Sequence, residues 1–343
     1  MRNSITIALT IASALAVAGG LFMMIHNQEK PSVPTPVADA FTHWKQTNGK
    51  SYGTDSENSY RLSVFAENYL KVQAAASNTD LTFTIGLNKF ADMTQKEFKA
   101  VYLGLKKSTK TTKNTKNIKS LDVTLPSHVD WRGIAVTDVK NQGQCGSCWA
   151  FSATGSAEGA YAIKNNEVKS FSEQQLIDCA GGNWGNNGCN GGLMDRAFKY
   201  VIDKGLMLES EYGYTAADGF CQYKAEEVVF TPSSYTDVEM YNTDALMAAI
   251  HQQPVSVGIE ADSHYFQLYT SGVFNHWSCG TDINHGVLAV GYGTDSGIWG
   301  LDYWLVKNSW GKNWGLSGYI MMARRATGVG MCGITAEASY PSA

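Results

Sequence analysis

The most informative stretch of the chain is residues 141–152, which read Asn-Gln-Gly-Gln-Cys-Gly-Ser-Cys-Trp-Ala-Phe-Ser. The glycines at positions 143 and 146 interrupt regular structure. The residues from Cys148 to Tyr161 are mostly small or apolar, in a pattern typical of a buried helix. Cys148 is therefore expected to open a helix, where the positive end of the helix dipole favours a thiolate. This makes Cys148 a candidate nucleophile.

Cys145 and Cys148 are compatible with three kinds of site. A thioredoxin-like redox pair needs a βαβ setting, which the surrounding sequence does not offer. A zinc site needs two further ligands, and the other five cysteines are scattered without a second C-x2-C pair. The third alternative is one half-cystine beside one free nucleophile. The odd total of seven cysteines, all between Cys145 and Cys332, leaves such a free sulfur, and we expect no metal and no cofactor.

Two residues have the spacing and surroundings of catalytic partners. His285 lies 137 residues after Cys148 and stands at the start of the apolar, strand-like run 287–290. Asn308 lies 160 residues after Cys148 and follows a second strand-like run, 303–307. An isolated histidine is more often structural, and we expect this of the other six: His26, His43, His128, His251, His264 and His276.

The motif Cys145-Gly-Ser-Cys148-Trp149, combined with a distant histidine and asparagine, resembles the papain family of cysteine proteases. The N-terminal third resembles the propeptides of that family. One propeptide signature is matched at Glu57, Arg61, Phe65 and Asn68 and departs from the usual residues at Val72 and Ala76. A second signature is matched at all of its positions: Gly86, Asn88, Phe90 and Asp92. From about Phe41 to Pro341 the chain is similar to a cathepsin L-type preproenzyme.

The resemblance implies the fold and the catalytic roles. The expected fold is α+β: a papain-like mature enzyme with a helical left domain, a β-barrel-like right domain and a cleft between them, after a mainly helical inhibitory prodomain. Cys148 would be the nucleophile and His285 its acid–base partner. Asn308 would orient the imidazole, and Trp310 would shield that hydrogen bond from water. Gln142 and the backbone N–H of Cys148 would form the oxyanion hole.

The resemblance also implies the residues that bind substrate. Gly191 and Gly192 would lie against the substrate backbone. The pocket for P2, the second residue before the cut, would be lined by Leu193, Met194, Gly258, Ile283 and Gly286. Such a pocket is apolar and accepts Leu or Phe. Its floor would be Glu337, five residues after Cys332, whose carboxylate could pair with an arginine; the alternative is an ordinary surface glutamate.

The six cysteines other than Cys148 allow 15 pairings, and sequence alone does not choose among them. The family pattern implies three disulfides: Cys145–Cys189, Cys179–Cys221 and Cys279–Cys332.

The chain is expected to be organised in three parts. Residues 1–18 have the pattern of a signal peptide, the alternative being an uncleaved signal anchor over residues 5–25. Residues 19–124 form the expected propeptide, with an inhibitor domain over about 40–104 and a Lys-rich linker over 106–119. Within this part we predict a proline-rich linker from Pro31 to Pro36, a helix over 57–76, and a helix capped by Thr94 and Glu97. Residues 125–343 form the expected mature peptidase.

The two parts differ in charge. Residues 1–124 carry 15 Lys/Arg and 9 Asp/Glu, whereas residues 125–343 carry 12 Lys/Arg and 22 Asp/Glu. The overall charge of −4 argues against a nucleic-acid partner, and 44% hydrophobic residues exclude a disordered chain. Attraction between a basic propeptide and an acidic enzyme should weaken as carboxylates are protonated, so we expect latency at neutral pH and self-processing in acid.

Other function classes fit less well. An inactive homologue would usually lack the nucleophile, and a stand-alone inhibitor would lack the catalytic half. An exopeptidase would usually carry an extra segment that blocks the cleft, and only a short Gly/Asn loop, 181–188, lies between Cys179 and Cys189. We expect an endopeptidase acting on proteins and peptides, inhibited by its own propeptide and by cystatin-type inhibitors. The expected protein is a monomer of the secretory pathway, in a lysosome-like acidic vesicle or outside the cell, with no membrane span after signal cleavage.

Overall fold

The computed structural model describes residues 33–107 and 124–343. They belong to two compact units, of which the first ends at Ala66 and the second begins at Glu67. The expected signal peptide or anchor, and most of the expected Lys-rich linker, lie outside the described residues. Within those residues, none of the helices has both the length and the apolar character needed to cross a membrane.

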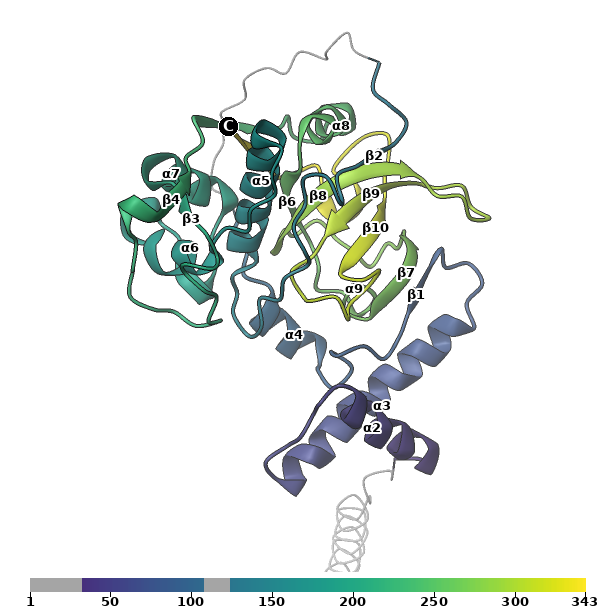
Figure 1. The fold of residues 1–343 in the computed structure, drawn as a ribbon. Coiled ribbons are helices and arrows are strands. Elements are labelled where there is room, and N and C mark those ends of the chain that lie inside the picture. Colours follow the sequence, from purple (N-terminus) through teal and green to yellow (C-terminus); the bar gives the residue numbers. More distant parts are fainter. Residues whose placement is uncertain (1–32, 108–123) are drawn as a thin grey trace, which may run out of the picture. The chain divides into compact units, whose positions relative to one another are not determined.

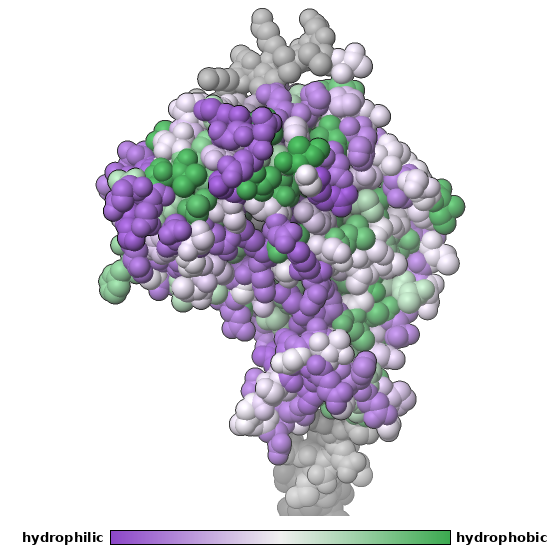
Figure 2. Space-filling model, in the orientation of Figure 1, coloured by the Kyte–Doolittle hydropathy of each residue, from purple (hydrophilic) through white to green (hydrophobic). Residues whose placement is uncertain are grey.

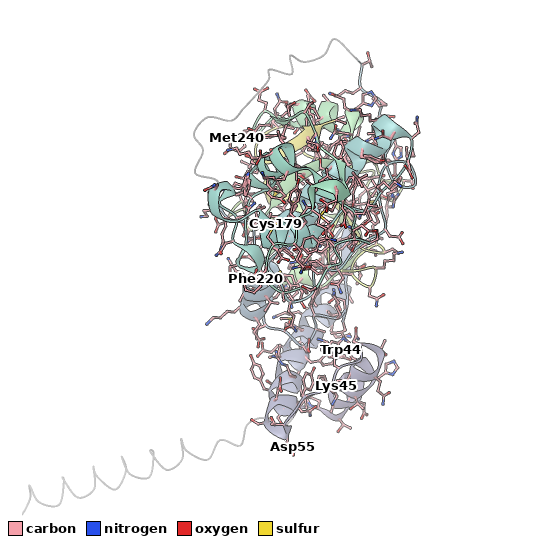
Figure 3. The ribbon with its side chains drawn as sticks, turned by 60° about the vertical axis from the view of Figure 1, so that its left-hand side comes forward. Trp44, Lys45, Asp55, Cys179, Phe220 and Met240 are labelled. Atoms are coloured by element: carbon pink, nitrogen blue, oxygen red, sulfur yellow. A yellow bond between two sulfur atoms is a disulfide. The ribbon has the colours of Figure 1, made fainter. Side chains whose placement is uncertain are left out.

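The first unit contains α2 (Thr35–Thr47) and the beginning of α3 (Asp55–Ala76). The rings of Phe41, Trp44 and Phe65 lie 5.2–6.1 Å apart and form its core. Figure 3 labels Trp44 on α2 and Asp55 at the start of α3. The predicted helix over residues 57–76 is therefore confirmed within α3, which begins two residues earlier, at Asp55.

The prediction of a proline-rich linker up to Pro36 is wrong at its C-terminal end. The helix α2 already begins at Thr35, with Pro34 as its N-cap and Pro36 within its first turn. Proline is tolerated there because the first N–H groups of a helix have no partner within the helix.

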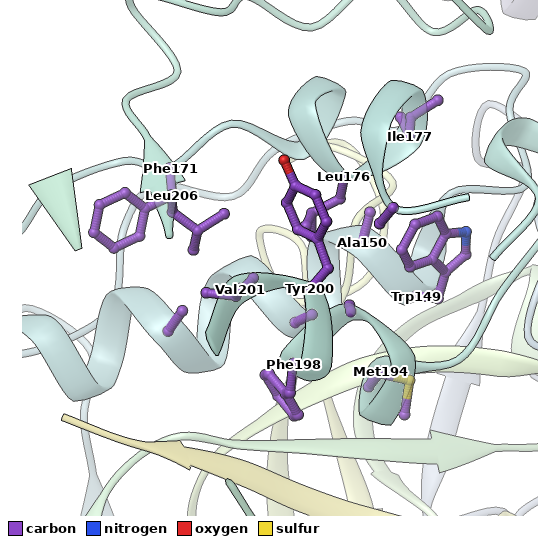
Figure 4. Close-up of a cluster of buried hydrophobic side chains, with 14 of the residues drawn as sticks. Trp149, Ala150, Phe171, Leu176, Ile177, Met194, Phe198, Tyr200, Val201 and Leu206 are labelled. Atoms are coloured by element: carbon purple, nitrogen blue, oxygen red, sulfur yellow. The ribbon is translucent and has the colours of Figure 1, made fainter. Parts of the chain in front are cut away.

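The helical lobe of the second unit is built on α5 (Cys148–Asn165), α6 (Glu173–Cys179) and α7 (Met194–Lys204). The helix α5 packs against α6 and α7 on one side and against strands of the sheet on the other (Figure 1). This close packing requires small residues, because a Cβ at Gly155 would lie 2.8 Å from a methyl carbon of Leu288. Figure 4 shows the apolar cluster of this lobe, with Trp149, Phe198 and Tyr200 among its members.

The other lobe is a sheet. The strands are β1 (Phe83–Ile85), β2 (Val129–Asp130), β5 (Ser234–Asp237), β6 (Val255–Ile259), β7 (Tyr269–Phe274), β8 (His285–Thr294), β9 (Asp302–Lys307), β10 (Tyr319–Ala323) and β11 (Ala338–Ser342). In the described part of the chain they form one nine-stranded sheet in the order β1-β7-β10-β9-β8-β6-β11-β5, with β2 paired to β8. Strand β8 is buried along nearly its whole length and begins at His285.

The remaining elements are short. A separate pair of strands, β3 (Leu206–Met207) and β4 (Val228–Phe230), belongs to the helical lobe, and α8 (Thr243–Gln252) and α9 (His264–Gln267) connect strands of the sheet. The 3-10 turns are η1 (Gly182–Trp184), η2 (Gly188–Asn190), η3 (Ala225–Glu227) and η4 (Met331–Gly333). On the face in Figure 2, hydrophilic residues surround small groups of hydrophobic ones.

Part of the expected propeptide is built into the second unit. Strand β1 pairs antiparallel with β7, and Phe83 lies opposite Gly272. The helix α4 (Gln95–Tyr102) follows with the predicted capping box: the Thr94 hydroxyl accepts from the Glu97 N–H, and the Glu97 carboxylate accepts from the Thr94 N–H. This reciprocal pair fixes the start of the helix whose C-terminal end delivers Tyr102.

The seven cysteines all lie in the described residues, and Cys148 is the free one. The three disulfides are those that the resemblance implies: Cys145–Cys189, Cys179–Cys221 and Cys279–Cys332. The first ties the loop before α5 to the glycine-rich loop before α7. The nucleophile's segment is therefore anchored to the segment that carries Gly191 and Gly192.

Candidate active site

Cys148 is the first residue of α5, with Ser147 as N-cap, and it is fully buried. The glycine-broken loop before it lets the chain enter the helix with the thiol at the positive end of the dipole. Burial raises the pKa of the Cys148 thiol, and hydrogen bonds from backbone N–H groups of Gly286, Gly104, Trp149 and Leu105 oppose the rise. Burial therefore favours the neutral thiol.

His285 and Asn308 form the predicted pair. The Nε2 atom of His285 lies 2.9 Å from Oδ1 of Asn308, which also accepts from the N–H of Ser309. An amide oxygen can only accept, so Nε2 carries the proton and Nδ1 is the basic nitrogen. Nδ1 has no hydrogen-bond partner among the described residues, which leaves it available to receive a proton.

The surroundings of His285 keep its ring in place. The indole of Trp310 stacks on the imidazole at 4.7 Å between ring centroids, and both residues are fully buried. Burial lowers the pKa of His285 to about 4, against a smaller opposing effect of the Asn308 hydrogen bond. Burial thus favours the neutral forms of both the imidazole and the thiol, as expected for a site that is closed to water.

Gln142 is buried and is held from several sides. Its Oε1 accepts from the Ser309 hydroxyl at 2.6 Å, and its backbone N–H donates to the Ser309 carbonyl. Its Nε2 donates to the carbonyl of Cys145 at 2.9 Å and to the carbonyl of Tyr102 at 3.0 Å. The Gln142 side-chain amide, which is expected to bind the oxyanion, therefore already donates to the Tyr102 carbonyl.

The peptide that reaches this site is residues 102–106. The N–H of Gly192 donates to the Gly104 carbonyl, and the Gly192 carbonyl accepts from the Lys106 N–H, both at 3.0 Å. On the other side the Leu105 N–H donates to the Asn284 carbonyl at 3.1 Å. The segment is therefore hydrogen-bonded to both lobes. Leu105 pairs with Gly192 in an isolated bridge of the kind that joins neighbouring β-strands.

The side chain of Leu105 is 6% exposed and belongs to the same buried cluster as Cys148, Trp149 and Met194. It lies beside Gly258, where an added Cβ would be 3.0 Å from a Leu105 methyl, 2.7 Å from Ile283 and 3.2 Å from the Glu337 Cβ. Glu337 is half-buried, and its carbonyl accepts from the Gly258 N–H. The structure thus brings Gly258, Ile283 and Glu337 together around a leucine.

The remaining predicted binding residues border this place. Gly191 has a φ of 103°, and a Cβ there would overlap the Gly104 carbonyl. Gly286 faces the Met194 sulfur and the start of α5, where a Cβ would lie 3.2 Å from that sulfur. Leu193 is the N-cap of α7 and lies in the same apolar cluster. Substitution of Gly191 would therefore disturb the bound segment, and substitution of Gly286 would disturb the start of α5.

Three residues that contact the site were not predicted: Asn284, Ser309 and Tyr214. The first two are sequence neighbours of His285 and Asn308, so the motifs could have indicated them. Tyr214 has no such signal, because its hydroxyl donates to the Gln142 carbonyl from 72 residues away.

A buried ionic cluster behind α5 was also missed. The ammonium of Lys140 lies 2.7–3.1 Å from carboxylates of Glu158, Glu173 and Glu209. Burial raises the pKa of Glu173 to about 7, although Lys140 opposes the rise. The cluster fixes α5 and α6 to the loop that leads to Gln142. No group of three side chains that could hold a metal ion occurs within residues 33–107 and 124–343.

Comparisons with known proteins agree with this geometry. Residues 125–342 match the papain family of cysteine proteases, and residues 41–98 match the cathepsin propeptide inhibitor domain. Cysteine proteinase RD21A of Arabidopsis thaliana is 41% identical, over 98% of this chain and 75% of that protein. The cathepsin L-like proteinase of Fasciola hepatica is 43% identical, over 88% of this chain and 93% of that protein.

The fold comparison includes the propeptide. The digestive procathepsin L 3 of Tenebrio molitor larval midgut has a TM-score of 0.82 and 39% identity, over 90% of this chain and 100% of that chain. A recombinant stem bromelain precursor has a TM-score of 0.81 and 38% identity, over 90% and 99% of the two chains. The chain is therefore a peptide hydrolase in proenzyme form that belongs to the papain family of cysteine proteases.

Proposed function

We propose that the chain is a latent cysteine endopeptidase in which Cys148, His285, Asn308 and Gln142 perform catalysis. The observation that carries this proposal is the position of residues 102–106, which lie as a bound peptide would. Their backbone pairs with Gly192, a carbonyl meets the Gln142 amide, and a leucine side chain fills an apolar pocket.

In the reaction, the proton of the Cys148 thiol passes to Nδ1 of His285, and the thiolate attacks the scissile carbonyl carbon. The oxyanion accepts hydrogen bonds from the Gln142 amide and the Cys148 backbone N–H, each worth roughly 3–4 kcal/mol in comparable sites. The imidazolium gives its proton to the leaving amine, and a thioester remains. A water molecule deprotonated by His285 then hydrolyses the thioester and restores the thiol.

Specificity resides in the pocket that Leu105 fills. We propose that Leu193, Met194, Gly258, Ile283 and Gly286 line the P2 pocket, with Gly191 and Gly192 along the substrate backbone. The pocket favours Leu or Phe because burial of an apolar side chain is worth roughly 1.5–3 kcal/mol. With Glu337 ionised, the pocket also accepts Arg through a charge-assisted pair.

The same segment explains latency. Leu105 lies in the same buried cluster as Cys148, and Cys148 is fully buried, so the segment separates the nucleophile from substrate. The Gln142 donor is occupied by the Tyr102 carbonyl. We propose that residues 19–124 act as the propeptide after removal of residues 1–18, and that acid releases them to give a peptidase of residues 125–343.

Biological context follows from these assignments. An acid-activated protease with disulfides fits the secretory pathway, either in a lysosome-like vesicle or outside the cell. Protein and peptide substrates, cystatin-type inhibitors and a monomeric mature enzyme complete the proposal. Endopeptidase action is favoured because the loop between Cys179 and Cys189 carries no large insertion that could block the cleft.

The test uses enzyme freed of its propeptide in acid and a substrate blocked at both ends, which an exopeptidase cannot cleave. Variants that cannot process themselves are processed by added wild-type enzyme, which is then separated from them. Cys148→Ala should abolish hydrolysis and labelling by an epoxide thiol reagent. Asn308→Ala should retain labelling and keep activity reduced by roughly 10²-fold, because orientation of the acid–base group is lost while the nucleophile remains. Ordinary turnover by Cys148→Ala would refute the nucleophile, and cleavage of unblocked peptides alone would refute endopeptidase action.

A further inference from the structure

The hydroxyl of Tyr214 joins the two ends of the loop that carries the oxyanion-hole donors. It donates to the Gln142 carbonyl at 2.6 Å and lies 2.8 Å from the Ser147 hydroxyl. Since the tyrosine's single proton goes to the carbonyl, the serine must donate to the tyrosine oxygen. The result is a chain of two hydrogen bonds from the residue before the nucleophile to the residue that supplies the amide.

We propose that Tyr214 is a positioning residue of the oxyanion hole, which it holds by fixing Gln142 relative to the start of α5. This inference rests on the proposed catalytic role of Gln142. The two proposed donors, the Gln142 side chain and the Cys148 N–H, belong to opposite ends of one loop. A displacement of either end by an ångström would separate the donors from the developing oxyanion.

The Cys145–Cys189 disulfide anchors the middle of this loop, and the composition of the loop calls for a further restraint at its Gln142 end. Gly143 has a φ of 60° and Gly146 lies one residue before Ser147, so two glycines separate the donors. Glycine restricts the backbone less than any other residue. Ser309 holds the side chain and the backbone N–H of Gln142, and Tyr214 holds its carbonyl from the helical lobe.

Ser147 is used in an unusual way. A serine at the N-cap of a helix ordinarily accepts a hydrogen bond from a backbone N–H of the first turn. Ser147 makes no such capping bond in α5, and its hydroxyl is turned to Tyr214. Ser147 therefore hydrogen-bonds to Tyr214, and through it to Gln142, in place of a capping hydrogen bond.

The ring of Tyr214 is fixed independently of its hydroxyl. It packs edge-on against Phe151 of α5, with ring centroids 4.9 Å apart. Its loop also touches Gly143, where an added Cβ would lie 3.2 Å from the Ala216 Cβ. Burial raises the pKa of the Tyr214 hydroxyl, so it remains a donor over the working range of a protease. Tyr214→Phe should therefore remove the hydrogen-bond chain and keep the packing.

The experiment compares Tyr214→Phe with Tyr212→Phe in the acid-processed enzyme. Tyr212 is the matched control, because it is a buried tyrosine of the same loop whose hydroxyl donates to Asp178 at 2.7 Å, away from Gln142. Losing a whole oxyanion donor costs about 10²–10³-fold in kcat, so misplacing one should cost about 10-fold. We expect this loss in kcat for Tyr214→Phe, with KM unchanged and no comparable loss for Tyr212→Phe.

Two further readouts separate positioning from a general structural role. Alkylation of Cys148 by iodoacetamide involves no oxyanion, so its rate and its pH profile should be the same in Tyr214→Phe and in wild type. In a double-mutant cycle with Gln142→Ala, the effect of Tyr214→Phe should disappear, because its target is already removed. Ser147→Ala provides a second variant and should lower kcat in the same direction if Tyr214→Phe does not fold.

The outcomes distinguish this inference from the proposed function. If Gln142→Ala keeps full kcat, the oxyanion role of Gln142 is wrong and the inference falls with it. If Gln142→Ala is impaired but Tyr214→Phe matches wild type, only the inference is wrong. Additive losses in the cycle, or a parallel loss of alkylation rate, would also overturn it.

Discussion

We expect Glu337 to set the charge at the edge of the pocket that Leu105 occupies. Its Cβ is near Gly258, and its backbone carbonyl accepts from the Gly258 N–H at 2.7 Å. The alternative of an ordinary surface glutamate is less consistent with this half-buried position beside Ile283. A carboxylate here can meet a substrate guanidinium, whereas a leucine contacts only the apolar walls.

Glu337→Ala should therefore change specificity more than activity. We expect kcat/KM for a Z-Arg-Arg substrate at pH 6 to fall by about 10-fold, since a charge-assisted hydrogen bond is worth about 1.5–3 kcal/mol. The value for Z-Phe-Arg should change little. Only an ionised carboxylate can form a charged pair with arginine. In wild type, the kcat/KM for Z-Arg-Arg divided by the kcat/KM for Z-Phe-Arg should therefore rise between pH 4 and pH 7.

Glu337→Gln is the matched control, because it keeps the volume and removes the charge. It should behave like Glu337→Ala toward Z-Arg-Arg. If either variant cleaves that substrate as well as wild type at pH 6, Glu337 does not bind the P2 side chain.

The residues that meet at the candidate site could be located from sequence because they occur in local motifs. Cys148, His285 and Asn308 each lie in a short motif that can be recognised without knowledge of the fold. The atoms that act were not predictable. The identity of Nδ1 as the basic nitrogen follows only from the Asn308 contact at Nε2, and no residue pattern indicates which carbonyl Gln142 binds.

Elements were predictable where their signals are local. The start of α5 follows from the glycines before Cys148, and the start of α4 follows from Thr94 and Glu97, three residues apart. The place of β1 in the sheet was not predictable, because its partners are remote: the Thr82 hydroxyl donates to the Val273 carbonyl 191 residues away. Short strands acquire their position from such distant partners and from burial, not from propensity.

Strand β1 should be a main anchor of the propeptide. Phe83 is 3% exposed, and its ring lies 4.7 Å from that of Phe274 and 5.7 Å from that of Tyr265. Replacing a buried phenylalanine by alanine costs about 3–5 kcal/mol. We expect Phe83→Ala to weaken docking of the propeptide and to raise the pH at which processing begins.

The measurement is the pH of half-maximal processing in a fixed time, followed by gel electrophoresis. Leu70→Ala, an apolar truncation in α3 at a side chain that is 65% exposed, serves as the control and should leave this pH unchanged. A Phe83→Ala proenzyme that processes at the wild-type pH would show that β1 contributes little to latency.

At the scale of the whole molecule, the charge asymmetry of the sequence appears as specific pairs. Lys99 lies 2.5 Å from Asp262, and Lys107 lies 2.6 Å from Asp282. The Lys107 hydrogen bond lowers the pKa of Asp282, so this contact stabilises docking above the ordinary aspartate range and is lost as pH falls. Both lysines belong to the propeptide segment on either side of Leu105.

A histidine contributes in the same direction. Burial, together with the positive charge of Lys71 and the neighbouring His276, lowers the pKa of His264 to about 4 from its usual 6.5. The docked state therefore prefers the neutral imidazole. The part of this shift that comes from Lys71 of the propeptide disappears on release, so protonation between about pH 6.5 and pH 4 favours the released state.

These links predict how lysine removal and salt should act together. Lys99→Gln combined with Lys107→Gln should raise the pH at which the proenzyme processes itself, because the propeptide then binds less tightly to the enzyme. Added salt should do the same to wild type, since exposed pairs are screened when the ionic strength rises from about 0.05 to 0.5 M. The doubly substituted protein should respond less to salt, because the screened pairs are already absent.

Lys106→Gln is the control. Lys106 lies between the two lysines and makes no ion pair among residues 33–107 and 124–343. Its replacement should therefore leave both the processing pH and the salt response as in wild type. An equal upward shift for Lys106→Gln would mean that net propeptide charge governs latency and that the two pairs have no special part in it.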